Sequence, residues 1–151
     1  MDYHRITDET HPALNKIKII YEEAFPLRER RDFQQLVKLT SINYMRLVAI
    51  EDSSTFLGFF IQWEFEKFNY IEHIAIDPLQ RGKNYGSTIM KQIIDSNQKT
   101  LLLEVEPEET RYDDDWDLAV GDGSVCAISS ASQAGRPCTA ASPSLSTAKI
   151  E

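Results

Sequence analysis

The chain has 151 residues, of which 42% are apolar and 26% are charged. This length suits about one domain with a single hydrophobic core, and the composition excludes disordered and fibrous proteins. The net charge of −8 argues against a nucleic-acid partner bound through its phosphates. No apolar run is long enough to span a membrane, and the first ten residues lack a signal-peptide pattern. We therefore expect a soluble cytoplasmic protein with no membrane partner.

Composition divides the chain into two parts. Residues 119–151 are rich in Ala, Ser and Gly and contain no aromatic residue, whereas almost every Phe and Tyr lies before residue 110. A segment of this kind cannot build a core, so we expect one domain over residues 1–110 and a disordered, low-complexity tail over residues 111–151. The two cysteines, Cys126 and Cys138, are too few for a disulfide scaffold and lack the spacing of a zinc site.

Apolar periodicity predicts eight elements in the first part of the chain. Apolar residues at helical spacing follow Thr10, which we expect to cap the helix, and this pattern ends at Pro26. Apolar residues at every second position mark the central strands, which are separated by turns at 52–54 and 67–69. The predicted elements are strands at 3–6, 44–51, 56–65, 70–76 and 101–106, and helices from Thr10 to Pro26, at 31–39 and at 86–97. The order β-α-α-β-β-β-α-β predicts an α/β (α+β) fold with a mixed sheet, in which the last two strands are parallel.

The segment that carries chemistry runs from Tyr70 to Ser87. An apolar strand stops at Asp77-Pro78, and a loop rich in glycine and basic residues then opens directly into an amphipathic helix. Such a junction directs unpaired backbone N–H groups and the positive end of the helix dipole at one place, which suits a phosphate or pyrophosphate. The spacing matches neither the Walker loop nor the dinucleotide fingerprint.

The motif Arg81-Gly82-Lys83-Asn84-Tyr85-Gly86 resembles the R/Q-x-x-G-x-G/A signature of the GNAT superfamily of acetyl-CoA-dependent N-acetyltransferases. The strand end Ile74-Ala75-Ile76, the residues Pro78-Leu79-Gln80 and the element order are also similar to the family, and the resemblance covers Tyr3 to about Glu109. Asn84 stands at the first glycine of the signature. Because Asn tolerates a left-handed backbone better than other non-glycine residues, we expect the loop to form.

The resemblance implies that acetyl-CoA is the cosubstrate. The backbone amides of Gly82 to Ser87 would hold its pyrophosphate, and Ile74, Ala75 and Ile76 would pair with its pantetheine arm as an added strand does. The cofactor-binding residues implied are Ile74, Ala75, Ile76, Arg81, Gly82, Lys83, Asn84, Tyr85, Gly86 and Ser87. The family also implies that strands 70–76 and 101–106 splay apart to admit the cosubstrate.

Glu72 is the candidate catalytic base, acting directly or through a water. Its parity along the strand predicts that its side chain lies on the same side of the sheet as those of Ile74 and Ile76. An exposed strand glutamate without a catalytic role is an equal alternative. The opposite parity of His73 predicts a packed or hydrogen-bonded histidine. Glu104, with Glu106 on the same strand face, is a candidate to bind a cationic amine, and a solvated strand edge is the alternative.

The acceptor is less defined than the cosubstrate. In the family the segment joining the first two helices borders the acceptor groove, so Phe25 to Arg31 is expected to shape specificity. The resemblance implies a primary amine on a small molecule or a peptide. Alternatives are a non-catalytic or truncated remnant that binds coenzyme A, and a different domain that binds a phosphate ligand at the same helix terminus.

The C-terminal sequence departs from the family. Where similar members continue approximately as Arg-Arg-Arg-(Ile/Leu)-Gly-Phe-Tyr, this chain reads Arg111-Tyr112-Asp113-Asp114-Asp115-Trp116-Asp117-Leu118. Codons that encode this run, read two nucleotides later, can encode Arg-Arg-Leu-Gly-Phe, so we interpret the tail as out-of-frame translation. The alternative is a natural extension, which resequencing of the gene would distinguish. Without the family's last helix and strands, apolar faces would be exposed, and a homo-oligomer would be one way to cover them.

Overall fold

The computed structural model describes residues 1–104 and 125–128. The elements are β1 (Asp2–Ile6), α1 (Leu14–Ala24), α2 (Phe33–Leu39), β2 (Met45–Asp52), β3 (Thr55–Glu64), β4 (Phe68–Ile76), the 3-10 turn η1 (Pro78–Gln80), α3 (Tyr85–Ser96), β5 (Thr100–Glu104) and β6 (Val125–Ile128). The predicted order of strands and helices is confirmed through β5. Glu106 and most of the predicted tail lie outside the described residues.

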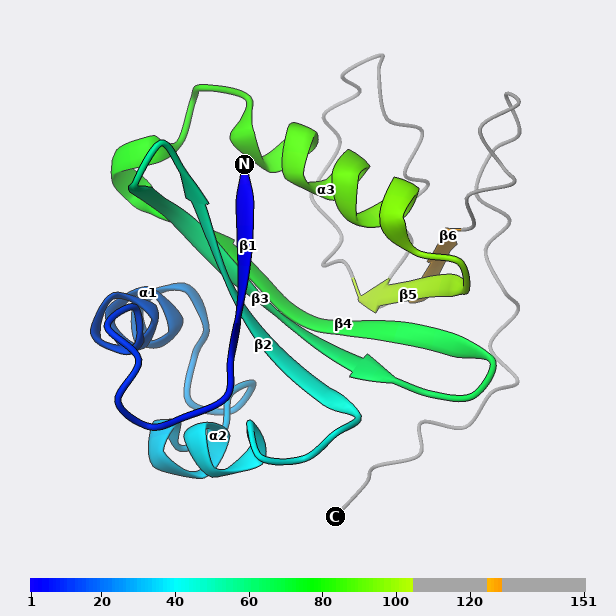
Figure 1. Cartoon of the computed structure of the whole chain (residues 1–151), viewed down its shortest axis with the longest axis horizontal. Coiled ribbons are helices and arrows are strands. Elements are labelled where there is room, and N and C mark those ends of the chain that lie inside the picture. The colour runs from blue at the N-terminus through cyan, green and yellow to red at the C-terminus, as the bar shows by residue number, and fades with distance from the viewer. Residues whose placement is uncertain (105–124, 129–151) are drawn as a thin grey trace.

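One mixed sheet forms the centre of the molecule. Strands β1 to β4 are antiparallel neighbours in chain order, β4 is parallel to β5, and β6 is antiparallel to β5. Helices α1 and α2 cover one face of the sheet, and α3 crosses the other (Figure 1). Strand β6 was not predicted, since its sequence lies in the segment where we expected little structure.

Two apolar cores fill the spaces between the sheet and its helices. The core beneath α1 and α2 contains the fully buried Tyr21 and Phe59, while the core beneath α3 contains Ile71 and Ile89. The apolar stripes read from the sequence place these side chains correctly, because helical spacing on α1 and α3 puts one face of each helix toward the sheet. The two cores give the sheet a buried surface on both sides.

The start of α1 differs from the prediction. The helix begins at Leu14 after Ala13, so Thr10 is not its cap. The Asp8 carboxylate accepts hydrogen bonds from the Thr10 backbone N–H at 2.8 Å and from its hydroxyl at 2.6 Å. The side chain of Thr10 is thereby used in a local turn, of the kind that Asp commonly forms ahead of a helix.

The second helix and the turn before β4 also differ in their bounds. The Asp32 side chain caps α2 by accepting from the N–H groups of Gln34 and Gln35, so the helix begins at Phe33 and not at residue 31. The turn predicted at 67–69 lies earlier, because Phe68 is already the first residue of β4 and its carbonyl accepts from Phe65 N–H at 2.9 Å.

Gly58 allows β3 to approach the end of β4 closely. A Cβ atom added at Gly58 would lie 2.2 Å from the carbonyl oxygen of Ala75 and 3.0 Å from Ile76 Cα. The carbonyl of the preceding residue, Leu57, accepts from Asp77 N–H at 2.8 Å. The backbone of β3 therefore fixes the place where β4 ends and the signature loop begins.

Substitution Gly58→Ala is expected to destabilise the protein by about 1–3 kcal/mol, because the added methyl group meets backbone atoms that cannot rotate away. Urea denaturation measures the change. Gly86→Ala is the matched control, since its Cβ would lie 3.8 Å from Ile76 Cγ1 in ordinary contact. Equal urea midpoints for Gly58→Ala and the wild type would contradict the close approach.

Candidate functional site

The junction from β4 to α3 is held by local hydrogen bonds. The Asp77 carboxylate accepts from Leu79 N–H at 2.9 Å and starts η1, and Arg81 Nε donates to the carbonyl oxygen of Ile76 at 3.2 Å. Beyond η1 the backbone is left-handed at Gly82, with φ of 75°, and at Asn84, with φ of 63°. The expectation that Asn84 adopts this conformation in place of glycine is therefore confirmed.

The first turn of α3 presents free backbone donors. Asn84 makes no side-chain cap, and the first backbone bond of the helix runs from Thr88 N–H to the Asn84 carbonyl at 3.2 Å. The N–H groups of Tyr85, Gly86 and Ser87 precede that bond and point out of the helix end. Together with the positive end of the helix dipole they favour an anion at this place.

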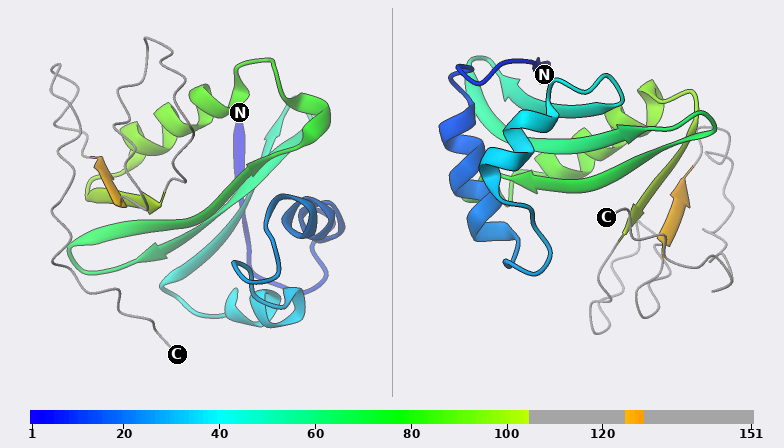
Figure 2. Two further views of the ribbon diagram at one scale, coloured as in Figure 1. Left: turned by 180° about the vertical axis from the view of Figure 1, so that it is seen from behind. Right: turned by 90° about the horizontal axis from the view of Figure 1, so that it is seen from below.

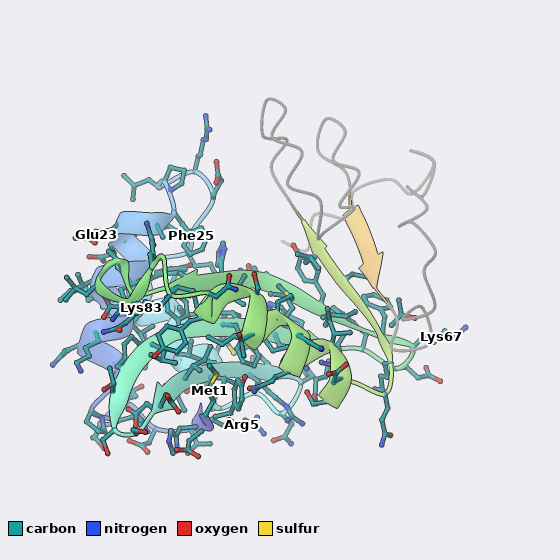
Figure 3. The ribbon with its side chains drawn as sticks, turned by 90° about the horizontal axis from the view of Figure 1, so that it is seen from above. Met1, Arg5, Glu23, Phe25, Lys67 and Lys83 are labelled. Atoms are coloured by element: carbon teal, nitrogen blue, oxygen red, sulfur yellow. The ribbon has the colours of Figure 1, made fainter. Side chains whose placement is uncertain are left out.

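A cavity of about 770 Å³ opens at this helix end. Its lining includes all ten residues that the resemblance implied for the cosubstrate: Ile74, Ala75, Ile76, Arg81, Gly82, Lys83, Asn84, Tyr85, Gly86 and Ser87. Ala24, Phe25 and Gln80 also line the cavity and were not included in that set. Figure 3 shows Phe25 and Lys83 at the same end of the molecule, with Lys67 at the opposite end.

Strand β4 contacts β5 along only half of its length. The register pairs Phe68 with Thr100 and ends where Ile71 pairs with Leu103. Figure 2 shows β5 turning away from the direction of β4. The last part of β4, Ile74 to Ile76, pairs with β3 on one side and lines the cavity. Its other edge is therefore available to a ligand, which could bind there as an added strand binds to an edge strand.

Glu72 is the extra residue of a bulge in β4. Ile61 of β3 pairs with His73 and Gln62 pairs with Ile71, which leaves Glu72 without an opposite residue. A bulge shifts the alternation of side chains by one position. The parity argument for Glu72 is therefore wrong: Ile74 and Ile76 pack in the core beneath α3, whereas Glu72 reaches the α1–α2 side of the sheet.

The Glu72 carboxylate is bonded through both of its oxygens. Oε1 lies 3.1 Å from Nη2 of Arg31, and Oε2 accepts from the Trp63 indole Nε1–H at 2.8 Å. Arg31 comes from the segment between α1 and α2, and Trp63 packs against the core on that side. The predicted site residue Glu72 is thus joined to a segment that we expected to border the acceptor.

His73 is a packed histidine, as predicted. Its side chain is buried, with ring centroids 4.2 Å from Phe25 and 5.3 Å from Tyr21. Its Nε2 has no hydrogen-bond partner among the described residues. Burial disfavours the charged imidazolium and lowers the pKa of His73, while the neighbouring Glu72 carboxylate acts in the opposite direction.

The remaining candidates add little to the site. Glu104 is the last residue of β5, and Glu106 lies outside the described residues, so their predicted role with a cationic amine stays a prediction. Within residues 1–104 and 125–128 no group of His, Cys, Asp and Glu side chains is arranged to hold a metal ion. None of the helices in this part of the chain is long and apolar enough to cross a membrane.

Comparison with known proteins identifies the family. Residues 11–114 match the model of the acetyltransferase (GNAT) family. This chain belongs to that family. A search of curated proteins gave no match.

Solved GNAT structures share the fold. A protein of Bacteroides thetaiotaomicron assigned to the GNAT acetyltransferases is 26% identical with a TM-score of 0.68, over 73% of this chain and 63% of that chain. Tetrahymena GCN5 is 16% identical with a TM-score of 0.58, and the match covers 85% of this chain and 96% of that chain. An aminoglycoside 6′-N-acetyltransferase complexed with coenzyme A is 13% identical with a TM-score of 0.54, and the match covers 70% of this chain and 62% of that chain. The chain therefore spans less than two thirds of the first and third of these structures.

The buried His73 is expected to make stability depend on pH. Because its pKa is lowered in the folded state, the unfolded chain takes up a proton first as pH falls below the ordinary value of about 6.5. The stabilisation is complete above that value and is lost as pH falls toward the folded pKa, by at most about 1.4 kcal/mol per pH unit. Urea denaturation between pH 7 and pH 5 measures this slope.

The variant His73→Phe supplies the comparison, because an aromatic ring is retained against Phe25 and Tyr21 while the titrating group is removed. The other titrating groups are common to both proteins and cancel in the difference. The variant should lose less stability than the wild type over this pH range. Identical slopes would show that burial of His73 does not affect its protonation.

Proposed function

We propose that this protein transfers an acetyl group from acetyl-CoA to a primary amine of a small molecule or peptide. The observation that carries the proposal is the cavity of about 770 Å³, which has the uncapped N-terminus of α3 on one side and the free edge of β4 on the other. Family membership and a related fold that binds coenzyme A support it.

The residues of the cavity fit acetyl-CoA in both chemistry and space. The N–H groups of Tyr85, Gly86 and Ser87 are donors for a pyrophosphate, and Gly82 has no atom within 4 Å of the position of a Cβ, which leaves room for close approach. Arg81 and Lys83 are exposed in the same loop and add positive charge. The backbone at Ile74 to Ile76 offers hydrogen-bonding groups to an extended amide chain.

Acetyl-CoA supplies a thioester, so that a C–N bond to the amine forms, the C–S bond breaks and coenzyme A leaves as a thiol after taking up a proton. The protein must remove a proton from the acceptor ammonium. We assign this step to Glu72, directly or through a water, because its carboxylate lies at the bulge where β4 separates from β5. One of the two hydrogen bonds to that carboxylate must open first.

Acetyl-CoA at a hundred times its dissociation constant is expected to stabilise the protein by about 2.7 kcal/mol. Gly86→Glu should lose this stabilisation, since a carboxylate at the helix N-terminus repels a pyrophosphate, although the cavity has room for the Cβ atom. Thermal denaturation with and without acetyl-CoA measures both. Gln98→Glu adds the same charge at an exposed position beyond the other end of α3 and should keep the shift. No stabilisation of the wild type would contradict the proposed site.

Glu72→Gln is expected to lower kcat by about a hundredfold or more, which is the usual effect of losing a positioned base. The amide can still accept from the Trp63 indole, and none of the residues lining the acetyl-CoA cavity is altered. The thermal stabilisation by acetyl-CoA should therefore stay as in the wild type. Steady-state assays of acetyl transfer test the role, and an unchanged kcat would remove Glu72 from it.

A further inference from the structure

An ion pair connects the α1–α2 segment with the bulge of β4. Arg31 Nη2 lies 3.1 Å from Glu72 Oε1, and the guanidinium carbon lies 5.7 Å from the centre of the Trp63 ring. The same Trp63 donates its indole hydrogen to Oε2 of Glu72. The Arg31 side chain is 42% exposed and that of Glu72 is 16% exposed, so the guanidinium faces solvent while the carboxylate lies deeper.

Arg31 is held at this position by its backbone. Its N–H donates to the hydroxyl of the buried Tyr21 at 2.9 Å, and the following residue, Asp32, caps α2. The neighbouring Arg30 is directed elsewhere, because its Nε donates to the carbonyl oxygen of Phe25 at 3.0 Å. Of these two adjacent arginines, only Arg31 contacts the carboxylate that we assign to proton removal.

The ion pair lies beside the acetyl-CoA cavity. Phe25 lines the cavity and contacts His73, the residue that follows Glu72. Ile74 and Ala75, two and three residues beyond Glu72, line the cavity as well. An acceptor amine that reaches the acetyl group from the α1–α2 side therefore meets Glu72 and Arg31 together.

An ammonium group that pairs with Glu72 must displace Arg31 from Oε1. The displaced guanidinium then lies over the Trp63 ring, partly exposed and without a carboxylate, so it is available to bind another anion. An acceptor that carries its own carboxylate satisfies both charges at once, because its ammonium pairs with Glu72 while its carboxylate binds the guanidinium. Arg is suited to this exchange, since its planar fork binds carboxylates through two hydrogen bonds.

We propose that the acceptor is an amino acid, with its ammonium and carboxylate on one carbon, and that Arg31 is the residue that recognises the carboxylate. This inference rests on the proposed function and narrows the acceptor class within it. It assigns Arg31 a part in substrate selection. Arg28 has no such part, because it contacts only its neighbour Glu29 among the described residues.

The experiment compares amino acids with their carboxamides as acceptors. Phenylalanine, leucine and glutamate are each assayed beside the matching α-carboxamide, and kcat/KM for acetyl transfer is measured. The wild type should prefer the acids at least tenfold, mainly through KM. Arg31→Gln should lower kcat/KM for the acids at least tenfold and abolish the preference, without lowering kcat/KM for the amides.

Arg46→Gln is the matched control. Arg46 also forms an ion pair, with Glu64 at 2.8 Å. Arg46 follows Met45 on β2 and Glu64 follows Trp63 on β3, and both Met45 and Trp63 face α1 and α2. The pair therefore lies on the other face of the sheet. This variant should keep the preference for acids. Equal or better transfer to the amides by the wild type would overturn the inference and leave the acetyltransferase proposal intact.

A second measurement does not require turnover. The Trp63 indole hydrogen is bonded to Glu72, so its NMR resonance reports exchange of the ion pair; Trp63→Phe distinguishes it from the signal of Trp116. In the presence of coenzyme A, the amino acids should shift this resonance in the wild type and not in Arg31→Gln. Absence of a shift with the acids would overturn the inference. A shift without transfer to any amine would instead contradict the proposed function.

Discussion

The bulge at Glu72 is the constraint on which the rest of the site depends. Because Glu72 of β4 has no partner on β3, the alternation of side chains between the two faces of the sheet shifts by one position there. The same place marks the end of pairing with β5, so the outer edge of Ile74 to Ile76 is left for a ligand. The bulge thus directs the Glu72 carboxylate toward the α1–α2 side of the sheet, at the point where β4 and β5 separate beside the cavity.

Local patterns were sufficient to predict most of the fold and the signature loop. Apolar spacing identified the strands and helices through β5, and the tolerance of Asn for a left-handed backbone explained how Asn84 replaces glycine. These features depend on residues that are close in sequence. The ten residues expected around the cosubstrate line one cavity for the same reason, since they lie in a single strand–loop–helix segment.

Features that depend on contacts between distant segments were not predictable. Parity assumes an uninterrupted strand, and the bulge at Glu72 arises from pairing with β3, which the sequence of β4 does not specify. The Thr10 cap was wrong because the helix begins only at Leu14, and Thr10 lies in a turn with Asp8 ahead of it. The contact between Arg31 and Glu72 joins residues 41 positions apart, and a mixed run of charges around Arg31 contains no signal for that partner. Ala24 reaches the cavity for the same tertiary reason, whereas Phe25 belongs to the segment that we expected to border the acceptor groove.

The hydrogen bonds at the end of β4 have a consequence for how the two sides of the site evolve. The Asp77 N–H is bonded to the Leu57 carbonyl and Arg81 Nε to the Ile76 carbonyl, so the start of the loop is tied to β3 and to the end of β4. The conformational entropy of these residues is therefore lost when the chain folds. The acceptor side that we propose depends instead on the exposed side chain of Arg31. Under the proposed function, new acceptor preferences would arise by exchange of one exposed residue while the proposed acetyl-CoA loop is preserved.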